Sequence, residues 1–289
     1  MPLNNILEKV KQLREVTGVG FKDCKNAIDE ANGDIEKSIE LLRKKGIAKA
    51  TNRMRRVAAE GLISIYEKNN NFAIAEINCE TDFVAKNEEF IKFSEEVSKI
   101  SLLKLGIVDE VLNSEMLNKK TVKNSLIDLI SKIGEKISIR RIESLQNDKY
   151  KNFSYVHSSI KKNVGKLGVI LSLETEKKIT EIQEFGKQLS MQIAATAPLA
   201  LDKDQLDKKI LEKEKEIITE ELKTSGKDAK IIDKIATGKL NKFINDNTLL
   251  NQEWIIDPKK TVKDVLKEIS GSEKMIIKKF VRFKVGEGV

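Results

Sequence analysis

Few residues in this sequence have the types and spacing that catalysis requires. Enzymes bring acids, bases, nucleophiles or metal ligands close together. The only histidine, His157, falls in a predicted strand, and no serine or cysteine stands at a recognisable nucleophile spacing. Cys24 and Cys79 are far apart, and each sits in an apolar pattern that is typical of a small buried thiol rather than a metal ligand. We therefore expect no enzyme active site, no metal site and no cofactor.

Two glycine-containing segments invite comparison with phosphate-binding motifs. Residues 18–20 (Gly-Val-Gly) lack the third glycine and the preceding strand of a dinucleotide fingerprint. Residues 225–227 (Ser-Gly-Lys) lack the upstream glycine of a phosphate-binding loop. Both segments are typical of turns, so we expect the chain to bind no nucleotide itself.

One segment places an acid beside a bulky aromatic residue, where a predicted strand ends and a helix begins. It spans residues 78–87 and contains Thr81, Asp82, Phe83 and Val84 in succession. In a purely structural interpretation, Thr81 caps the helix and Asp82 favours its positive end, while Phe83 and Val84 enter the core. In a functional interpretation, the segment inserts into a partner protein. The residues alone do not decide between the two.

Composition places these residues in an ordinary globular protein. With 289 residues, of which 40% are hydrophobic, the chain can form two or three domains. Its net charge of +8 points weakly to an acidic partner, because basic residues alternate with acids on predicted solvated helix faces. No apolar stretch approaches the roughly 18 residues of a membrane span, and the start of the chain lacks an export signal. We expect a cytoplasmic protein that binds no membrane.

The elements that position these residues begin with helices. Apolar residues at helical spacing predict a three-helix module in residues 1–48, with the third helix ending at Gly46. Residues 49–56 are basic and poor in apolar side chains, which predicts a helical linker.

The rest of the chain mixes strands with helices, so the predicted fold class is α+β. Residues 57–146 contain a β-hairpin with its turn at residues 68–71, two helices, and a strand near residues 137–142. Residues 147–289 repeat this plan loosely, with strands near 153–157, 167–173 and 275–285. A charged insertion at about residues 203–245 predicts two antiparallel helices joined by a glycine turn at residue 226.

Several motifs in this order resemble the translation elongation factor Ts family of the bacterial type, over essentially the whole chain. The main ones are residues 17–20 (Thr-Gly-Val-Gly) with 23–25 (Asp-Cys-Lys), 30–34 (Glu-Ala-Asn-Gly-Asp), 78–86 (Asn-Cys-Glu-Thr-Asp-Phe-Val-Ala-Lys) and 282–288 (Arg-Phe-Lys-Val-Gly-Glu-Gly). Residues 132–135 (Lys-Ile-Gly-Glu), 139–141 (Ile-Arg-Arg) and 191–195 (Met-Gln-Ile-Ala-Ala) support the resemblance.

The resemblance implies a fold and a function. The fold is a ubiquitin-associated-like N-terminal helical domain, a core of two subdomains with antiparallel sheets packed by helices, and an inserted helical hairpin. The function is guanine nucleotide exchange on elongation factor Tu, in which the factor displaces magnesium and promotes release of GDP. Such a factor changes no covalent bond, which agrees with the lack of catalytic motifs.

The resemblance also implies residue roles. Asp82 and Phe83 push into the partner beside its nucleotide-bound magnesium, and Thr81 and Val84 shape the segment. Further partner contacts map to Leu13, Val19 and Phe21 in the N-terminal domain and to His157. This chain departs from the family pattern at Lys22 and at residues 158–162, and it stops at residue 289, where many relatives continue into a C-terminal helix.

Other functions remain open. The net positive charge and the cluster Arg53, Arg55 and Arg56 would suit an RNA- or ribosome-associated protein, although the sparse aromatic residues disfavour direct nucleic-acid binding. A hydrolase that uses surface carboxylates lacks any motif. A homodimer through the predicted hairpin is a further possibility that the residues do not settle.

Overall fold

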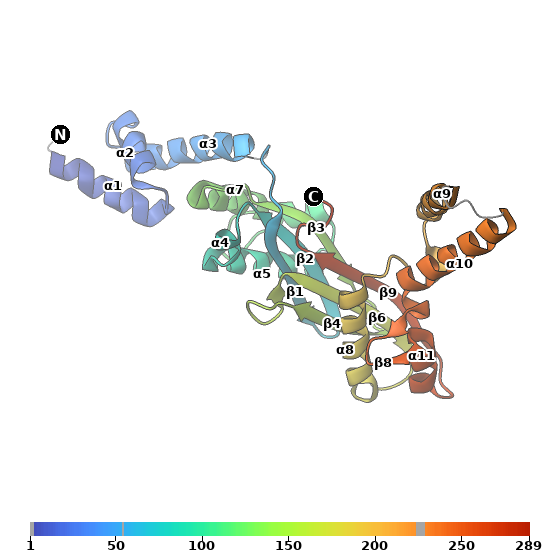
Figure 1. Cartoon of the computed structure of the whole chain (residues 1–289). Coiled ribbons are helices and arrows are strands. Elements are labelled where there is room, and N and C mark those ends of the chain that lie inside the picture. Colours follow the sequence, from blue (N-terminus) through green and yellow to red (C-terminus); the bar gives the residue numbers. More distant parts are fainter. Residues whose placement is uncertain (1–2, 54, 224–228) are drawn as a thin grey trace.

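The computed structural model describes residues 3–53, 55–223 and 229–289, and it begins with a three-helix module (Figure 1). The helices are α1 (Leu3–Thr17), α2 (Phe21–Glu30) and α3 (Ile35–Arg53). Their small core buries Val10, Leu13, Cys24, Ala27, Ile28 and Leu42. The predicted three-helix arrangement is confirmed, while its likeness to ubiquitin-associated domains rests on the family resemblance alone.

The third helix is longer than the sequence pattern predicted. We expected it to end at Gly46, but α3 continues to Arg53, so the predicted linker begins as part of this helix. A Cβ atom at Gly46 would lie 2.6 Å from Ser131 Oγ on α7 (Val122–Ile133). Gly46 therefore permits close packing between α3 and α7 and does not end a helix.

The first sheet is antiparallel and confirms the predicted hairpin. Asn69 and Asn70 form its two-residue turn, both with positive φ (50° and 61°), as the favoured hairpin turn requires. Across the sheet the strands are β3 (Ser138–Leu145), β2 (Asn71–Cys79), β1 (Glu60–Lys68) and β5 (Val164–Gly165). Strand β5 corrects the predicted plan, since a segment of residues 147–289 completes the first sheet.

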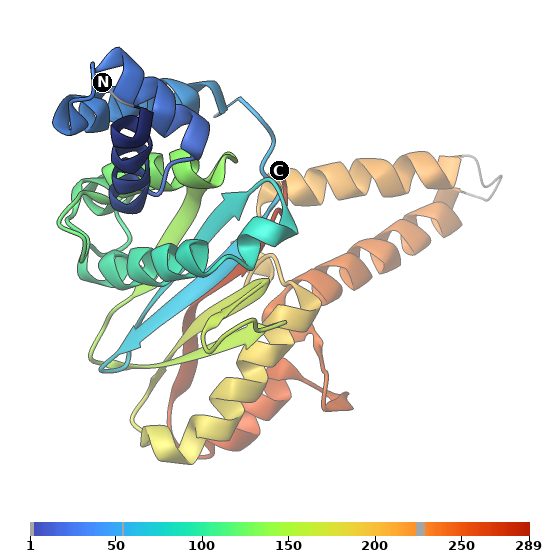
Figure 2. The ribbon, with the colours of Figure 1, turned by 90° about the vertical axis from the view of Figure 1, so that its left-hand side faces the viewer.

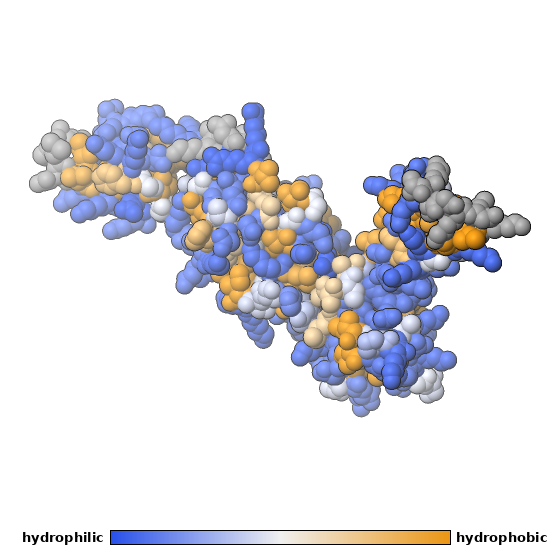
Figure 3. Space-filling view, viewed as in Figure 1, coloured by the Kyte–Doolittle hydropathy of each residue, from blue (hydrophilic) through white to orange (hydrophobic). Residues whose placement is uncertain are grey.

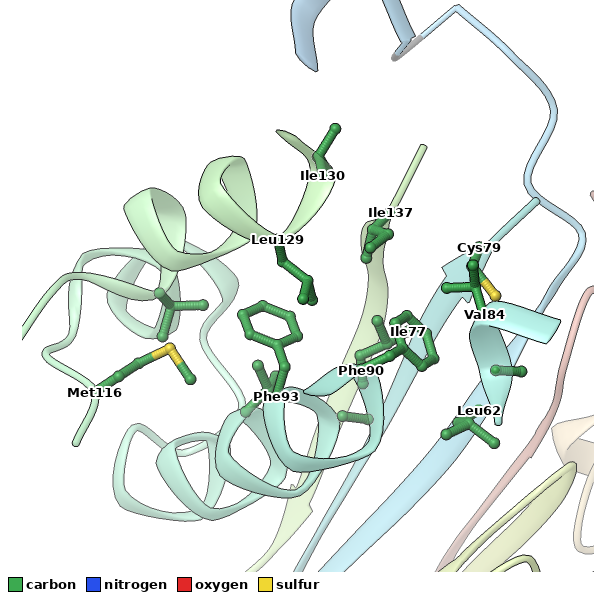
Figure 4. Packing of buried hydrophobic residues seen from close by; sticks show 14 of the residues in the cluster. Leu62, Ile77, Cys79, Val84, Phe90, Phe93, Met116, Leu129, Ile130 and Ile137 are labelled. Atoms are coloured by element: carbon green, nitrogen blue, oxygen red, sulfur yellow. The ribbon is translucent and has the colours of Figure 1, made fainter. Parts of the chain in front are cut away.

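Helices cover the outer face of this sheet. They are α4 (Asp82–Ala85), α5 (Glu88–Leu103), α6 (Val108–Asn113) and α7, of which α4 and α6 were not resolved as separate helices from the sequence. Figure 4 shows Phe90 and Phe93 of α5 among side chains of the sheet and of α7. This cluster is the largest hydrophobic core among the described residues.

The second sheet is also antiparallel, with the order β4 (Tyr150–His157), β6 (Leu167–Thr175), β9 (Met275–Lys284). Helix α8 (Ile179–Thr196) and helix α11 (Val262–Ser270) pack on it, together with the small hairpin of β7 (Glu253–Trp254) and β8 (Asp257–Thr261). Phe185 of α8 and Trp254 lie with ring centroids 6.1 Å apart in this second core.

The two sheets pack face to face, which the sequence did not predict. Alternate residues of β1, such as Ile63 and Ile65, meet Ile170 of β6 and Phe283 of β9 in a separate cluster. A Cβ atom at Gly168 would lie 2.6 Å from Ile63 Cγ2, so this glycine permits the close approach of the sheets. The resulting order of layers is helices, first sheet, second sheet, helices.

Helices α9 (Lys208–Lys223) and α10 (Ala229–Asn247) form the predicted antiparallel pair and project from the body (Figure 2). Short 3-10 helices, Lys203–Gln205 and Leu249–Asn251, flank them. The predicted turn at residues 225–227 lies outside the described residues. A dimer contact through this hairpin stays a prediction. No helix in the described part of the chain is long and apolar enough to cross a membrane.

The buried carboxylate of Glu76 joins the first sheet to the end of β9. Its Oε1 accepts hydrogen bonds from Arg140 Nη1 and from the backbone N of Gly286, both at 3.0 Å. Its Oε2 accepts from Arg141 Nε at 2.6 Å. Burial alone would raise the pKa of Glu76, but these donors outweigh burial and lower the pKa below its ordinary value of 4.5.

Replacing Glu76 with glutamine removes the charge that these donors need. At neutral pH we expect the free energy of unfolding to fall by roughly 2 to 4 kcal/mol, because two partly buried guanidinium groups lose their counter-ion. Since the pKa of Glu76 is lower in the folded state, its contribution is complete above the unfolded-state pKa and is lost as the pH falls through the folded value. When urea unfolding is measured, the difference in free energy of unfolding between wild type and Glu76→Gln should therefore become smaller below pH 4.5.

Glu143→Gln is the matched control, because Glu143 lies on the neighbouring strand β3 and its more exposed carboxylate contacts Lys279 Nζ at 2.8 Å. This variant should change the free energy of unfolding at neutral pH by less than about 1 kcal/mol, because exposed ion pairs contribute little. If Glu76→Gln lowered the free energy of unfolding by the same amount at neutral and at acid pH, the lowered pKa of Glu76 would be contradicted.

Candidate functional site

The corner between β2 and α5 contains the segment singled out by the sequence. Strand β2 ends at Cys79, helix α4 occupies Asp82–Ala85, and Asn87 caps α5 by accepting hydrogen bonds from Glu89 N at 2.9 Å and Phe90 N at 3.2 Å. We call residues 80–85 the corner. A helix of four residues is too short to be stable by itself, so neighbouring groups must fix its position.

Thr81 is the N-cap of α4, as the structural interpretation predicted. Its backbone is extended, and its Oγ1 accepts a long hydrogen bond of 3.5 Å from Val84 N. The same hydroxyl donates to Glu135 Oε1 at 2.7 Å. Glu135 Oε2 accepts from the backbone N of Thr81 at 3.0 Å and of Glu80 at 3.1 Å. One carboxylate therefore accepts three hydrogen bonds from the corner.

A second glutamate makes the reciprocal contact. Glu80 Oε1 accepts from the backbone N of Lys136 at 2.6 Å, and Glu80 Oε2 lies 3.2 Å from Arg56 Nη1. Lys136 Nζ in turn donates to the carbonyl oxygen of Arg56 at 2.7 Å. The corner is thus linked to the turn that follows α7 and to the chain that leads in from α3.

Val84 and Phe83 point in opposite directions. Val84 is 8% exposed and joins the first core beside Cys79, as Figure 4 shows, and Ala85 is fully buried. Phe83 is 80% exposed. Val84 therefore enters the core as the structural interpretation predicted, whereas Phe83 does not and leaves its ring in solvent.

Cys79 confirms the prediction of a buried thiol. Burial, followed by the nearby Glu135 carboxylate, raises the pKa of Cys79 to about 12. The thiol therefore stays protonated at neutral pH, and its Sγ lies 3.1 Å from the carbonyl oxygen of Thr81, to which it donates. Cys24 is likewise buried, and burial raises the pKa of its thiol.

Asp82 is partly exposed and paired within its own turn. Its Oδ2 lies 2.8 Å from Lys86 Nζ, four residues along. The hydrogen bond from Lys86 lowers the pKa of Asp82, and the positive charge of Lys166 contributes in the same direction. At neutral pH the corner therefore presents a charged carboxylate next to the ring of Phe83.

His157 lies next to Lys166, whose positive charge also acts on Asp82. The backbone N of Lys166 donates to the carbonyl oxygen of His157 at 3.3 Å, and Lys166 Nζ lies 2.6 Å from Glu60 Oε2. The imidazole is exposed, with Nδ1 3.0 Å from the hydroxyl of Tyr155. His157 is thus the last residue of β4, and its imidazole is open to solvent.

The N-terminal candidates differ in exposure. Phe21 is 45% exposed at the start of α2, and Val19 is partly buried in the turn before it. Leu13 is fully buried in the core of the module. Its side chain therefore has no surface to offer a partner, and the predicted contact through Leu13 cannot be direct in this conformation.

Figure 3 shows the hydropathy of one face of the molecule. On the face shown in Figure 3, hydrophobic residues are scattered among hydrophilic ones. Among the described residues, no group of three or more His, Cys, Asp or Glu side chains is arranged to hold a metal ion. The groups that the corner exposes are thus the Phe83 ring and the Asp82 carboxylate, on a fixed backbone.

Glu135 is the functional candidate that sequence reasoning missed. It belongs to residues 132–135, which supported the family resemblance without receiving a role. The contact with Thr81 joins residues 54 positions apart. Local periodicity carries no signal for such a pair, and the only clue was a glycine followed by an acid after a helix.

Known proteins with similar sequences share one description. A family model described as Elongation factor TS matches residues 80–287. A protein named Elongation factor Ts from Clostridium kluyveri is 42% identical over 289 residues, covering 98% of this chain and 93% of that protein. One from Methylorubrum populi is 40% identical over 283 residues, covering 97% of this chain and 92% of that protein.

Neighbouring substitutions in the corner separate contact surface from core. We expect Val84→Ala to lower the free energy of unfolding by about 1 to 2 kcal/mol, because it removes buried methyl groups. Phe83→Ala should change it by less than about 0.5 kcal/mol, because the ring is already in solvent. Urea unfolding of both variants measures the difference, and a larger loss for Phe83→Ala would show that the ring belongs to the core.

Proposed function

Because the chain belongs to the elongation factor Ts family, we propose that it is a guanine nucleotide exchange factor that binds elongation factor Tu in translation elongation. The exposed Phe83 on a fixed corner supports this role most directly, since it gives the chain an apolar projection next to a charged carboxylate. The role is one of a binding protein and not of an enzyme, and it places the chain in the cytoplasm, where translation takes place.

We propose that the corner acts on the magnesium site of the partner. Magnesium requires near-octahedral oxygen ligands and keeps several waters, so a small shift of the groups that hold these waters weakens its binding. Affinity for GDP then falls, because the ion no longer bridges protein and phosphate. Phe83 serves as the apolar wedge, since a rigid aromatic ring displaces neighbouring groups at low entropic cost. Asp82 supplies a charged acceptor for local polar groups.

The proposal explains how the factor leaves its partner. Coupling between two ligands is reciprocal, so a factor that weakens nucleotide binding is itself bound more weakly when nucleotide returns. GTP therefore expels the factor and permits another cycle. The chain needs no cofactor or metal of its own for these steps.

Two further surfaces are proposed contacts. Phe21, with Val19 beside it, is one exposed apolar part of the N-terminal module, which also exposes Leu7 and Val16, and it can dock on the partner while the corner acts. Leu13 supports this surface from inside the module. His157 is the third proposed contact, because it is exposed and linked through Lys166 to the surroundings of Asp82.

The RNA-associated alternative has less support in the structure. Arg53 Nη1 donates to the carbonyl oxygen of Ile130 at 2.8 Å, and Arg56 contacts Glu80. Two of the three clustered arginines are thus engaged within the protein, where Arg53 joins α3 to α7 and Arg56 contacts the corner. An RNA-binding role would predict affinity that falls steeply with salt.

Release of fluorescent GDP from elongation factor Tu tests the proposal in a stopped-flow instrument. At saturating factor we expect Phe83→Ala to slow the maximal release rate by roughly 10- to 30-fold, as loss of a central aromatic contact does elsewhere. Asp82→Ala should slow it by about 3- to 10-fold, because it removes one charged acceptor.

Leu117→Ala is the matched control, since Leu117 is 84% exposed and apolar but lies outside the corner. It should release GDP at the wild-type rate. A wild-type chain that leaves GDP release unchanged would refute the exchange function. If Phe83→Ala and Asp82→Ala both released GDP at the wild-type rate, the exchange function would stand, but the proposed roles of Phe83 and Asp82 would be refuted.

A further inference from the structure

The corner is fixed by two glutamates that each accept backbone hydrogen bonds from the opposite segment. Glu135 accepts from the backbone of Glu80 and Thr81, and Glu80 accepts from the backbone of Lys136 at 2.6 Å. We call Glu80 and Glu135 the glutamate brace. Hydrogen bonds to charged acceptors are about twice as strong as neutral ones, so the brace is a strong constraint on a short segment.

We propose that Glu135 is a positioning residue for nucleotide exchange, which holds Phe83 in the pose that enters the partner. This inference rests on the proposed function and adds a residue that does not itself contact the partner. Packing does little to hold the Phe83 side chain, because Phe83 is 80% exposed. The direction of the Phe83 side chain is therefore set by the backbone of α4. That helix starts after Thr81, whose hydroxyl and backbone N both donate to Glu135.

The turn that carries Glu135 is itself well anchored. Gly134 ends α7 in the left-handed conformation (φ 94°), and its backbone N donates to the carbonyl oxygen of Ile130 at 2.9 Å. Ile130 is 2% exposed in the first core, and Ile137, after the turn, is fully buried. The carboxylate of Glu135 therefore reaches the corner from a fixed platform.

Loss of the Glu135 carboxylate should loosen the corner without exposing new core. Val84 and Ala85 would still be buried, so α4 would remain near its place. Its first turn, however, would lose three hydrogen bonds to Glu135 and sample other directions. A displacement of about 1 Å at a working group can cost up to about 100-fold in rate.

A double-mutant cycle with Phe83 tests the proposal, again by release of fluorescent GDP at saturating factor. We expect Glu135→Ala to slow maximal release by about tenfold. We expect the double variant Phe83→Ala with Glu135→Ala to be no slower than Phe83→Ala alone, because a loosened corner without its ring has little left to misplace. Glu135→Gln should stay within about threefold of wild type, since its amide oxygen can accept from the two backbone N–H groups and its NH2 group can donate to the Thr81 hydroxyl oxygen.

Two further variants complete the experiment, one as a control and one as a replacement for Glu135→Ala. Glu89→Ala is the control, because Glu89 is an exposed carboxylate that contacts Lys132 of α7 without touching the corner, and it should match wild type. If Glu135→Ala does not fold, Glu135→Asp takes its place in the cycle. It keeps the charge, but the shorter side chain cannot span the same donors.

The outcomes separate the inference from the proposed function. The positioning role would be overturned, while the exchange function stands, by either of two results. One is GDP release at the wild-type rate by Glu135→Ala. The other is a double variant whose loss in rate equals the product of the two single losses. Wild-type rates for Phe83→Ala would overturn wedge and positioning role together. A wild-type chain that does not accelerate GDP release would refute the exchange function itself.

Discussion

The three hydrogen bonds that Glu135 accepts from Glu80 and Thr81 are the constraint on which the rest of the site depends. Helix α4 has only four residues and cannot hold a direction by its own hydrogen bonding. Glu135 fixes the first turn of α4 from outside, and Val84 is buried. Phe83, the residue before Val84, is left in solvent. An aromatic ring in solvent gains nothing from burial in the free chain, and the proposed partner contact would supply that burial.

The remainder of the fold keeps that corner still. Strand β2 leads into it, and the same strand carries Glu76, whose buried carboxylate joins Arg140 and Arg141 to the end of β9. The motif at residues 282–288 thus has a structural reason, because Phe283 packs between the sheets and Gly286 donates to Glu76. Glu76 lies near the end of β2 that leads into the corner, so its ion pairs hold the strand close to the point where the corner begins.

Much of this fold follows from local patterns. Helical and strand periodicity identified the three-helix module, the first hairpin and the projecting pair of helices, because these elements bury one face along a continuous segment. Gly46 was misinterpreted because its role is a close contact with Ser131, far away in sequence. The face-to-face sheets and Glu135 were missed for the same reason. The sequence also left Phe83 and Val84 equivalent, since a four-residue helix has no period from which to read a buried side.

The central claim is that Phe83 is the exposed contact of a corner whose pose is already set in the free protein. The most direct measurement is an experimental structure of this chain bound to nucleotide-free elongation factor Tu. The account predicts that the Phe83 ring is buried against the partner, with the hydrogen bonds between Glu135 and Thr81 retained as in the free chain. A complex in which the Phe83 ring remains in solvent, with the partner bound elsewhere, would contradict it.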